Sequence, residues 1–127
     1  MGNSFKDLRV WQRSIQLTVS VCKLTTGFPD AERFGLTNQL RRASVSIASN
    51  VAEGYGKSSR REYLQFLGHA RGSRAEVETQ LTIAGELGFG VAAVVNSTNA
   101  LCSEVSKMLV APMETAAHSR KEPGARS

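Results

Sequence analysis

The sequence predicts an all-α fold, specifically an antiparallel up-down four-helix bundle. Four segments of the 127-residue chain repeat apolar side chains at spacings of three and four residues, the period of a helix with one buried face. Stretches containing glycine or proline separate these segments, and no segment gives a convincing strand pattern. Four consecutive helices with such breaks between them are typical of an antiparallel bundle.

The first helix is predicted over residues 5–26, with Ser4 and Asp7 as a candidate capping pair. Its most regular apolar stripe is formed by Leu8, Trp11, Ile15, Val19 and Cys22. A second apolar set lies off that stripe and consists of Val10, Leu17, Val21 and Leu24. Because the helix is apolar over more of its surface than one buried face requires, we expect it to contact more than one neighbour, within the bundle or in another subunit.

A break follows at residues 27–30, where Pro29 cannot continue a helix and pushes Phe28 toward an extended backbone. The second helix is predicted over residues 37–53. Its buried stripe is formed by Leu40, Ala43, Ile47 and Val51. Alanine and serine fill many of the other positions, which indicates that a neighbouring helix packs closely.

The third helix is predicted over residues 59–87 and is the longest. Its buried face is formed by Tyr63, Phe66, Leu67, Ala70, Val77, Leu81 and Ala84. Glycine inside a helix costs about 1 kcal/mol against alanine. We therefore expect Gly68 and Gly72 to allow a close crossing by another helix, with a gentle bend as the alternative.

Glycines at 85, 88 and 90 end that pattern. Residues 91–95 are compatible with a short extended piece or with the entry to the last helix, and we predict a loop there. The fourth helix is predicted over residues 96–110, with Pro112 ending or kinking it. Its apolar face is formed by Leu101, Val105, Met108 and Leu109. The bundle domain is therefore expected to span residues 1–117, followed by a disordered polar tail, residues 118–127.

Composition places the chain among ordinary folded domains, with 41% apolar and 21% charged residues. No apolar run approaches the roughly 20 residues that span a bilayer, and the first residues lack the apolar core of a signal peptide. We therefore expect a cytoplasmic protein without a membrane partner. The net charge is +5, and residues 41–74 carry seven basic and two acidic side chains. This clustering is typical of proteins with a polyanionic partner, and the alternative is an ordinary solvated helix surface.

The connection after the second helix resembles a phosphate loop only superficially. Gly56-Lys57-Ser58 matches the end of that motif, but Val51 stands where its first glycine is required, and a helix precedes it instead of a strand. We expect a glycine at 54 or 56 to close the second helix in the left-handed conformation. Ser59 and Glu62 are predicted to form a capping box at the start of the third helix.

Three basic residues, Lys57, Arg60 and Arg61, flank that helix start. Positive charge in the first turn opposes the helix dipole, which favours anions there. A phosphate placed at this point would therefore interact favourably with the basic side chains and with the free backbone N–H groups.

The sequence offers no convincing catalytic or metal-binding set, so we predict a protein that is not an enzyme and needs no cofactor. Cys22 and Cys102 fall in apolar helical patterns and are expected to be buried free thiols. Together with His69 and His118 they match no zinc spacing. We expect His69 to be a partly exposed or hydrogen-bonded structural histidine.

Three stretches resemble a known family: "FKDLRVWQ" (residues 5–12), "ERFGLTNQLRRASVSIASNVAEG" (residues 32–54) and "EYLQFLGHARGSRAEVETQL" (residues 62–81). They are similar to four-helix bundle proteins encoded in intervening sequences of large-subunit ribosomal RNA genes. The resemblance implies an up-down bundle that assembles as a ring-shaped homopentamer. The family is also similar to the accessory variability determinant of diversity-generating retroelements, which implies a reverse transcriptase and nucleic acid as partners.

Two functional hypotheses follow. The first is a non-enzymatic accessory module that binds RNA or DNA through phosphate contacts, with Tyr55 as the one aromatic residue near enough to stack on a base. Its candidate nucleic-acid-binding residues are Arg41, Arg42, Lys57, Arg60, Arg61, Arg71 and Arg74. The second is an oligomeric scaffold for protein interactions, in which these arginines pair with carboxylates, for example Arg74 with Glu78 along the third helix.

Overall fold

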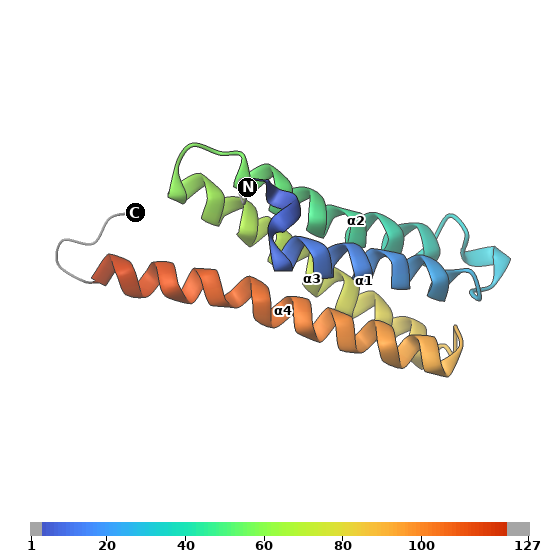
Figure 1. The fold of residues 1–127 in the computed structure, drawn as a ribbon. Helices are drawn as coiled ribbons and strands as arrows, with labels where there is room; N and C mark the ends of the chain where they lie inside the picture. The colour runs from blue at the N-terminus through green and yellow to red at the C-terminus, as the bar shows by residue number, and fades with distance from the viewer. Residues whose placement is uncertain (1–3, 122–127) are drawn as a thin grey trace.

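The computed structural model describes residues 4–121, with side chains described for residues 4–110. Its four α-helices are α1 (Arg9–Thr25), α2 (Leu36–Tyr55), α3 (Arg60–Glu86) and α4 (Ala92–Lys121), and no strand occurs within the described range. Two short 3-10 helices, η1 (Phe5–Asp7) and η2 (Asp30–Glu32), precede α1 and α2. Consecutive helices are joined at alternating ends, so the bundle runs up and down, and α1 lies between α2 and α4 (Figure 1). The expected all-α four-helix fold is confirmed.

All four helices contribute to one core. Its side chains with no exposed surface are Leu17 and Val21 from α1, Leu40, Ile47 and Val51 from α2, Leu67, Ala70 and Val77 from α3, and Val105 and Leu109 from α4. Burying each large aliphatic side chain contributes about 1.5–3 kcal/mol, so these contacts between helices dominate the stability of the bundle. None of the helices, over the described residues, is long and apolar enough to cross a membrane.

The orientation of α1 differs from the simplest interpretation of its apolar pattern. The second apolar set faces the core, with Leu17, Val21 and Leu24 at most 2% exposed. The second half of the more regular stripe faces outward, where Ile15 is 37% and Val19 48% exposed, whereas Leu8 and Trp11 at its start pack partly buried against the core. Both sets share the helical period, so spacing alone cannot decide which one the other three helices cover.

The two cysteines have different surroundings. Cys102 on α4 is buried, as expected. Cys22 was expected to be buried too, and that prediction is wrong, because it follows Val19 on the outward stripe of α1 and is exposed.

The small residues of α2 allow α3 to approach closely, as predicted. An added Cβ on Gly54 would lie 2.8 Å from the Cβ atom of Phe66, and the hydroxyls of Ser46 and Ser73 are 2.9 Å apart across the two helices. Gly54 therefore lies inside α2, where it allows the close packing of α3, and Gly56 has φ −81°. Neither glycine adopts the left-handed conformation, so the prediction that one of them does is wrong.

The expected close crossing along α3 is wrong at Gly72. An added Cβ there would meet nothing within 4 Å, so the glycine admits no neighbouring helix. Helix α3 instead makes its closest glycine contact with α2 at Gly54.

The left-handed glycines occur at the α3–α4 turn. Gly88 and Gly90 have φ values of 74° and 89°, and the N–H of Phe89 donates to the carbonyl of Ala84 at 2.9 Å. The N–H of Gly88 donates to the carbonyl of Gly85, which completes a Schellman ending for α3. The ring of Phe89 then packs 5.5 Å from that of Phe28, and so closes this end of the core.

Helix α4 is longer than predicted. It begins at Ala92, so residues 92–95 are its entry and not a loop, and it continues through Pro112 to Lys121. The expectation that the helix ends at Pro112 is therefore wrong. Residues 118–121 of the predicted tail therefore belong to α4, and residues 122–127 lie outside the described residues.

Candidate nucleic-acid interface

The seven basic residues singled out from the sequence fall into three groups along the bundle. Lys57 lies in the α2–α3 connection, and Arg60 and Arg61 lie in the first turn of α3. Arg41 and Arg42 lie in the first half of α2, roughly 20 Å away at 1.5 Å per helical residue. Arg71 and Arg74 lie in the middle of α3. One chain therefore does not bring all seven into a single patch.

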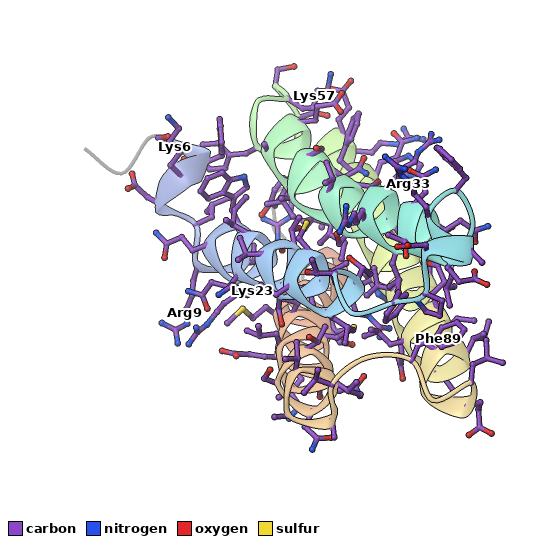
Figure 2. All side chains as sticks on the ribbon, turned by 90° about the vertical axis from the view of Figure 1, so that its right-hand side faces the viewer. Lys6, Arg9, Lys23, Arg33, Lys57 and Phe89 are labelled. Atoms are coloured by element: carbon purple, nitrogen blue, oxygen red, sulfur yellow. The ribbon has the colours of Figure 1, made fainter. Side chains whose placement is uncertain are left out.

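Other basic side chains lie elsewhere around the bundle. Figure 2 labels Lys6, Arg9, Lys23 and Arg33, in addition to Lys57, at separate places around the bundle. Basic charge alone therefore does not distinguish one face, and the partners of each side chain have to be compared.

Arg41 and Arg74 are held by neighbouring groups. Arg41 donates from Nε to the Thr25 hydroxyl at 2.8 Å, and its Nη2 lies 3.5 Å from the carbonyl oxygen of Cys22, so it connects α2 to α1. Arg74 forms an ion pair with Glu78 one turn later, which confirms that predicted contact. Its side chain is 17% exposed, which leaves little of it for an external ligand.

The residues at the α2–α3 end have a different environment. Lys57, Arg60 and Arg61, which we name the basic end, form no ion pair with any carboxylate among the described residues. Lys57 and Arg61 are exposed and Arg60 is half-buried. The ammonium of Lys57 lies 5.0 Å from the centre of the Phe66 ring, a cation–π contact that orients it without neutralising it.

A side-chain cap fixes where the basic end begins. The Ser59 hydroxyl accepts from the N–H of Glu62 at 3.1 Å and donates to the Glu62 carboxylate at 3.2 Å. The predicted pairing of Ser59 with Glu62 is thus confirmed, although Glu62 binds the hydroxyl of Ser59 and not its backbone N–H. The cap starts α3 at Arg60, so Arg60 and Arg61 both occupy its first turn.

A cleft lies beside the basic end. It has a volume of ≈ 320 Å³ and is lined by Gly54, Tyr55, Lys57, Ser58, Ser59, Arg60 and Tyr63. Both tyrosines are half-buried. Burial raises the pKa of the Tyr63 hydroxyl above its ordinary value, nearby Tyr55 raises it further, and Arg60 opposes the shift.

Tyr63 lines this cleft, although the sequence pattern predicts only a place for it on the buried face of α3 and singles out Tyr55 alone for stacking. The signal available was its spacing, because Tyr63 follows Arg60 by three residues and therefore shares its side of the helix.

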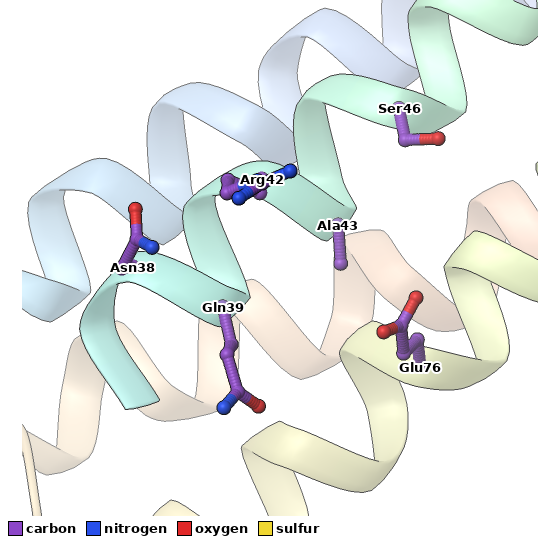
Figure 3. Close-up of a pocket in the computed structure, with 6 residues that line it drawn as sticks. All are labelled: Asn38, Gln39, Arg42, Ala43, Ser46 and Glu76. Carbon is purple, nitrogen blue, oxygen red and sulfur yellow. The ribbon is translucent and has the colours of Figure 1, made fainter. Parts of the chain in front are cut away.

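A second hollow lies between α2 and α3, near Arg42. It has a volume of ≈ 320 Å³ and is lined by Asn38, Gln39, Arg42, Ala43, Ser46 and Glu76. Gln39 extends from α2 and Glu76 from α3 on opposite sides of it (Figure 3). Its walls are mostly polar and largely exposed, so Arg42 is accessible to a ligand but belongs to a region separate from the basic end.

No metal centre emerges among the described side chains. Within this part of the chain, no three His, Cys, Asp or Glu side chains come together to hold a metal ion. The His69 ring is exposed and lies edge-on to Phe66 with centroids 5.7 Å apart. The side chain of His118 is outside the described range.

Comparison with known proteins bears on the fold and the family. Residues 6–111 match the family described as 23S rRNA-intervening sequence protein. The fold resembles a crystal structure of a protein of unknown function from the S23 ribosomal protein family of Bacteroides thetaiotaomicron VPI-5482, with a TM-score of 0.71 and 22% identity. That similarity covers 80% of this chain and 95% of the other. No curated protein matches the chain.

The matched residues run from η1 into α4 and include all of α1, α2 and α3. The family expected from the three sequence stretches is therefore confirmed, while the likeness to retroelement accessory proteins stays a prediction. The chain belongs to the 23S rRNA-intervening sequence protein family.

Proposed function

We propose that this protein is a non-enzymatic, oligomeric module that binds RNA or DNA through the phosphate backbone. The observation that carries the proposal is the basic end, where Lys57, Arg60 and Arg61 lack carboxylate partners among the described residues. Three cations and one carboxylate, Glu62, at this helix start leave a net positive charge, which a polyanion would neutralise favourably. Neutralising each phosphate releases counterions, so the affinity should fall steeply with salt concentration.

The proposal includes self-association through the outer surface of α1 and α2. The outward stripe residues Ile15, Val19 and Cys22 lie on α1, and Val45 on α2 is 51% exposed. The hydroxyl of Thr18 donates to the carbonyl of Ser44 at 3.1 Å, so the positions that follow, Val19 and Val45, lie on neighbouring helices.

We name Ile15, Val19, Cys22 and Val45 the outer face. An open hollow of ≈ 360 Å³ adjoins it, lined by Arg41, Arg42, Val45 and Ser46. Exposed apolar residues gathered on one face are typical of protein–protein contacts. Copies joined through this face, as in the homopentamer that the family resemblance implied, would repeat the basic end and add weak phosphate contacts together.

Filter binding tests the proposal. A labelled 30-nucleotide RNA and a DNA of the same sequence are mixed with the protein at 50 and 200 mM salt. We expect the affinity measured from the retained fraction to drop by at least tenfold between the two salt concentrations, since a few phosphate contacts suffice for such a loss. The triple variant Lys57→Glu, Arg60→Glu, Arg61→Glu should bind neither.

The matched control carries the same change in net charge at exposed positions elsewhere: Lys23→Glu, Arg33→Glu and Lys107→Glu. It should lose much less affinity than the variant of the basic end. Equal losses in the two variants would assign binding to net charge alone, and absence of retention by the unmodified protein at 50 mM salt would end the proposal.

The scaffold hypothesis is the second candidate, and the outer face favours it. Under it, reversing Arg60 and Arg61 to glutamate would change assembly or a protein contact, with a reverse transcriptase as the proposed partner, and nucleic acid would have no effect. Co-purification of a tagged protein with such an enzyme, before and after nuclease treatment, separates a protein contact from one bridged by nucleic acid.

A further inference from the structure

The cleft at the α2–α3 end contains two aromatic rings besides its cations. Tyr55 is the last residue of α2, and Tyr63 lies in the first turns of α3. Both line the same cleft with Lys57 and Arg60, and we name it the tyrosine cleft. We infer that the tyrosine cleft holds one unpaired base of a single-stranded nucleic acid. The inference rests on the proposed function and deepens it from general phosphate binding to a preference for single strands.

The chain brings the two tyrosines together by a sharp reversal. Four residues, Gly56 to Ser59, separate α2 from α3, and the N–H of Lys57 donates to the carbonyl of Gly54 at 3.1 Å. An added Cβ on Gly54 would lie 3.3 Å from the carbonyl oxygen of Tyr63, so the backbones of the two helices are in close contact beside the cleft. The rings are thus carried by helices whose spacing is fixed by packing.

The burial of the tyrosines suits stacking on a base. Each ring is half-buried, so part of it rests on the protein and part remains accessible from the cleft. Stacking a base on an aromatic side chain changes affinity by about 5- to 150-fold in alanine substitutions of comparable sites.

The cations are placed to bind the phosphate of the same nucleotide. Lys57 and Arg60 both line the cleft, and Lys57 is oriented by its contact with the Phe66 ring. The volume of ≈ 320 Å³ matches the lower end of small-molecule sites, which suits a single nucleoside and not a base pair.

A duplex cannot use this site. Its bases are stacked on both sides and paired at their edges, so none is available without unstacking. A base in a single strand meets no such cost. The arrangement of ring, cation and cleft therefore predicts that single strands bind more tightly than duplexes of the same sequence.

Fluorescence anisotropy tests this inference with three labelled probes at 50 mM salt: a 20-nucleotide RNA free of self-pairing, the DNA of the same sequence, and the blunt RNA duplex. The unmodified protein should bind one or both single strands at least fivefold more tightly than the duplex. The double variant Tyr55→Leu, Tyr63→Leu should lose about tenfold for single strands, within the range for a lost stack, and keep its duplex affinity. The double Phe variant, Tyr55→Phe with Tyr63→Phe, should retain the single-strand preference.

Two further variants make the result specific. Phe34→Leu removes an aromatic ring that is 86% exposed at the opposite end of the bundle, and it should change no affinity. Because Tyr63 contacts the core, Tyr55→Leu alone is included, and circular dichroism melting confirms that each variant is folded. A probe with one 5-iodouridine should cross-link under ultraviolet light to a peptide that contains Tyr55 or Tyr63.

The outcomes separate the two proposals. If the double Leu variant binds single strands as well as the unmodified protein does, the inference that the tyrosine cleft holds a base is wrong. The proposal of phosphate binding by the basic end is then unchanged. If the glutamate variant of the basic end keeps its single-strand affinity and the double Leu variant loses it, base stacking by the two tyrosines is supported, and phosphate binding by Lys57 and Arg60 is wrong both in the cleft and in the basic end. If no probe binds, both proposals are wrong.

Discussion

Gly54 and Phe66 lie so close that an added Cβ on Gly54 would approach the Cβ atom of Phe66 to 2.8 Å. Real side chains do not approach to that distance, so either α2 or α3 must move if any other residue replaces the glycine. The contact explains why a glycine occupies the last turn of a helix without adopting a left-handed backbone.

Gly54→Ala should therefore destabilise the protein, by about 1–3 kcal/mol, the usual cost of inserting a methyl group into a packed interior. Urea unfolding followed by circular dichroism measures the change. Gly72→Ala is the matched control, because a Cβ there meets nothing within 4 Å, and it should stabilise the protein by up to about 1 kcal/mol. Equal effects of the two substitutions would contradict the close approach.

The two apolar sets of α1 should respond differently to substitution. Leu17→Ala creates a cavity in the core and should cost about 2–5 kcal/mol. Val19→Asp changes the outer face and should lower the molar mass measured by light scattering while the urea midpoint of the dissociated chain stays near its original value. If the Val19→Asp protein keeps its full molar mass, the outer face does not take part in the assembly.

The glycines of the α3–α4 turn should also differ from each other. In Gly88→Ala the added Cβ meets nothing within 4 Å, so the free energy of unfolding should fall only by the strain of a left-handed alanine, about 1–2 kcal/mol. Gly90→Ala combines that strain with a Cβ placed 2.5 Å from Leu24 Cδ1, so its thermal midpoint should fall further than that of Gly88→Ala. If the two midpoints coincide, Leu24 yields to the new methyl group at no cost.

The two thiols should be distinguishable by their reactivity. In the native protein at pH 7.5, a thiol reagent such as dithionitrobenzoate should modify the exposed Cys22 quickly and the buried Cys102 only on unfolding. Cys22→Ser supplies the control, since it should leave no rapidly reacting thiol.

Burial also raises the pKa of the Cys102 thiol, whereas its hydrogen bond and charge contact with Arg74 lower it. The folded protein therefore holds this proton at a pH at which the unfolded chain releases it. The contribution to stability is complete below about pH 9, the ordinary pKa of this thiol, and declines as the pH rises above that value. Cys102→Ala should remove this decline from the urea midpoints measured between pH 7 and pH 10.

The sequence alone predicts α2 and α3 closely, because each has one apolar face and α3 also begins at a side-chain cap. Ser59 and Glu62 mark the start of α3, and Leu40, Ile47 and Val51 form the only continuous stripe of α2. Helix α1 is harder, because two stripes have the same period and only the positions of the other helices select between them.

The candidate site was predictable in part. The basic residues at 57, 60 and 61 follow from composition and from the cap that begins α3. The engagement of Arg41 by Thr25 depends on how α1 packs against α2, and no local pattern encodes it. Tyr63 was missed because its helical position marks it as a core residue, whereas the end of the bundle leaves one side of its ring uncovered.

The α3–α4 turn has a consequence for limited proteolysis. Glycine-rich connections are usually the first places that a protease cleaves, because the chain must become extended in the enzyme. Here Gly90 packs against Leu24 and Phe28, and the Schellman hydrogen bonds hold the residues before it. A protease of broad specificity such as subtilisin should instead cut first in the α2–α3 connection, residues 56–59, so that the earliest fragments separate α1 and α2 from α3 and α4 and the α3–α4 turn stays intact.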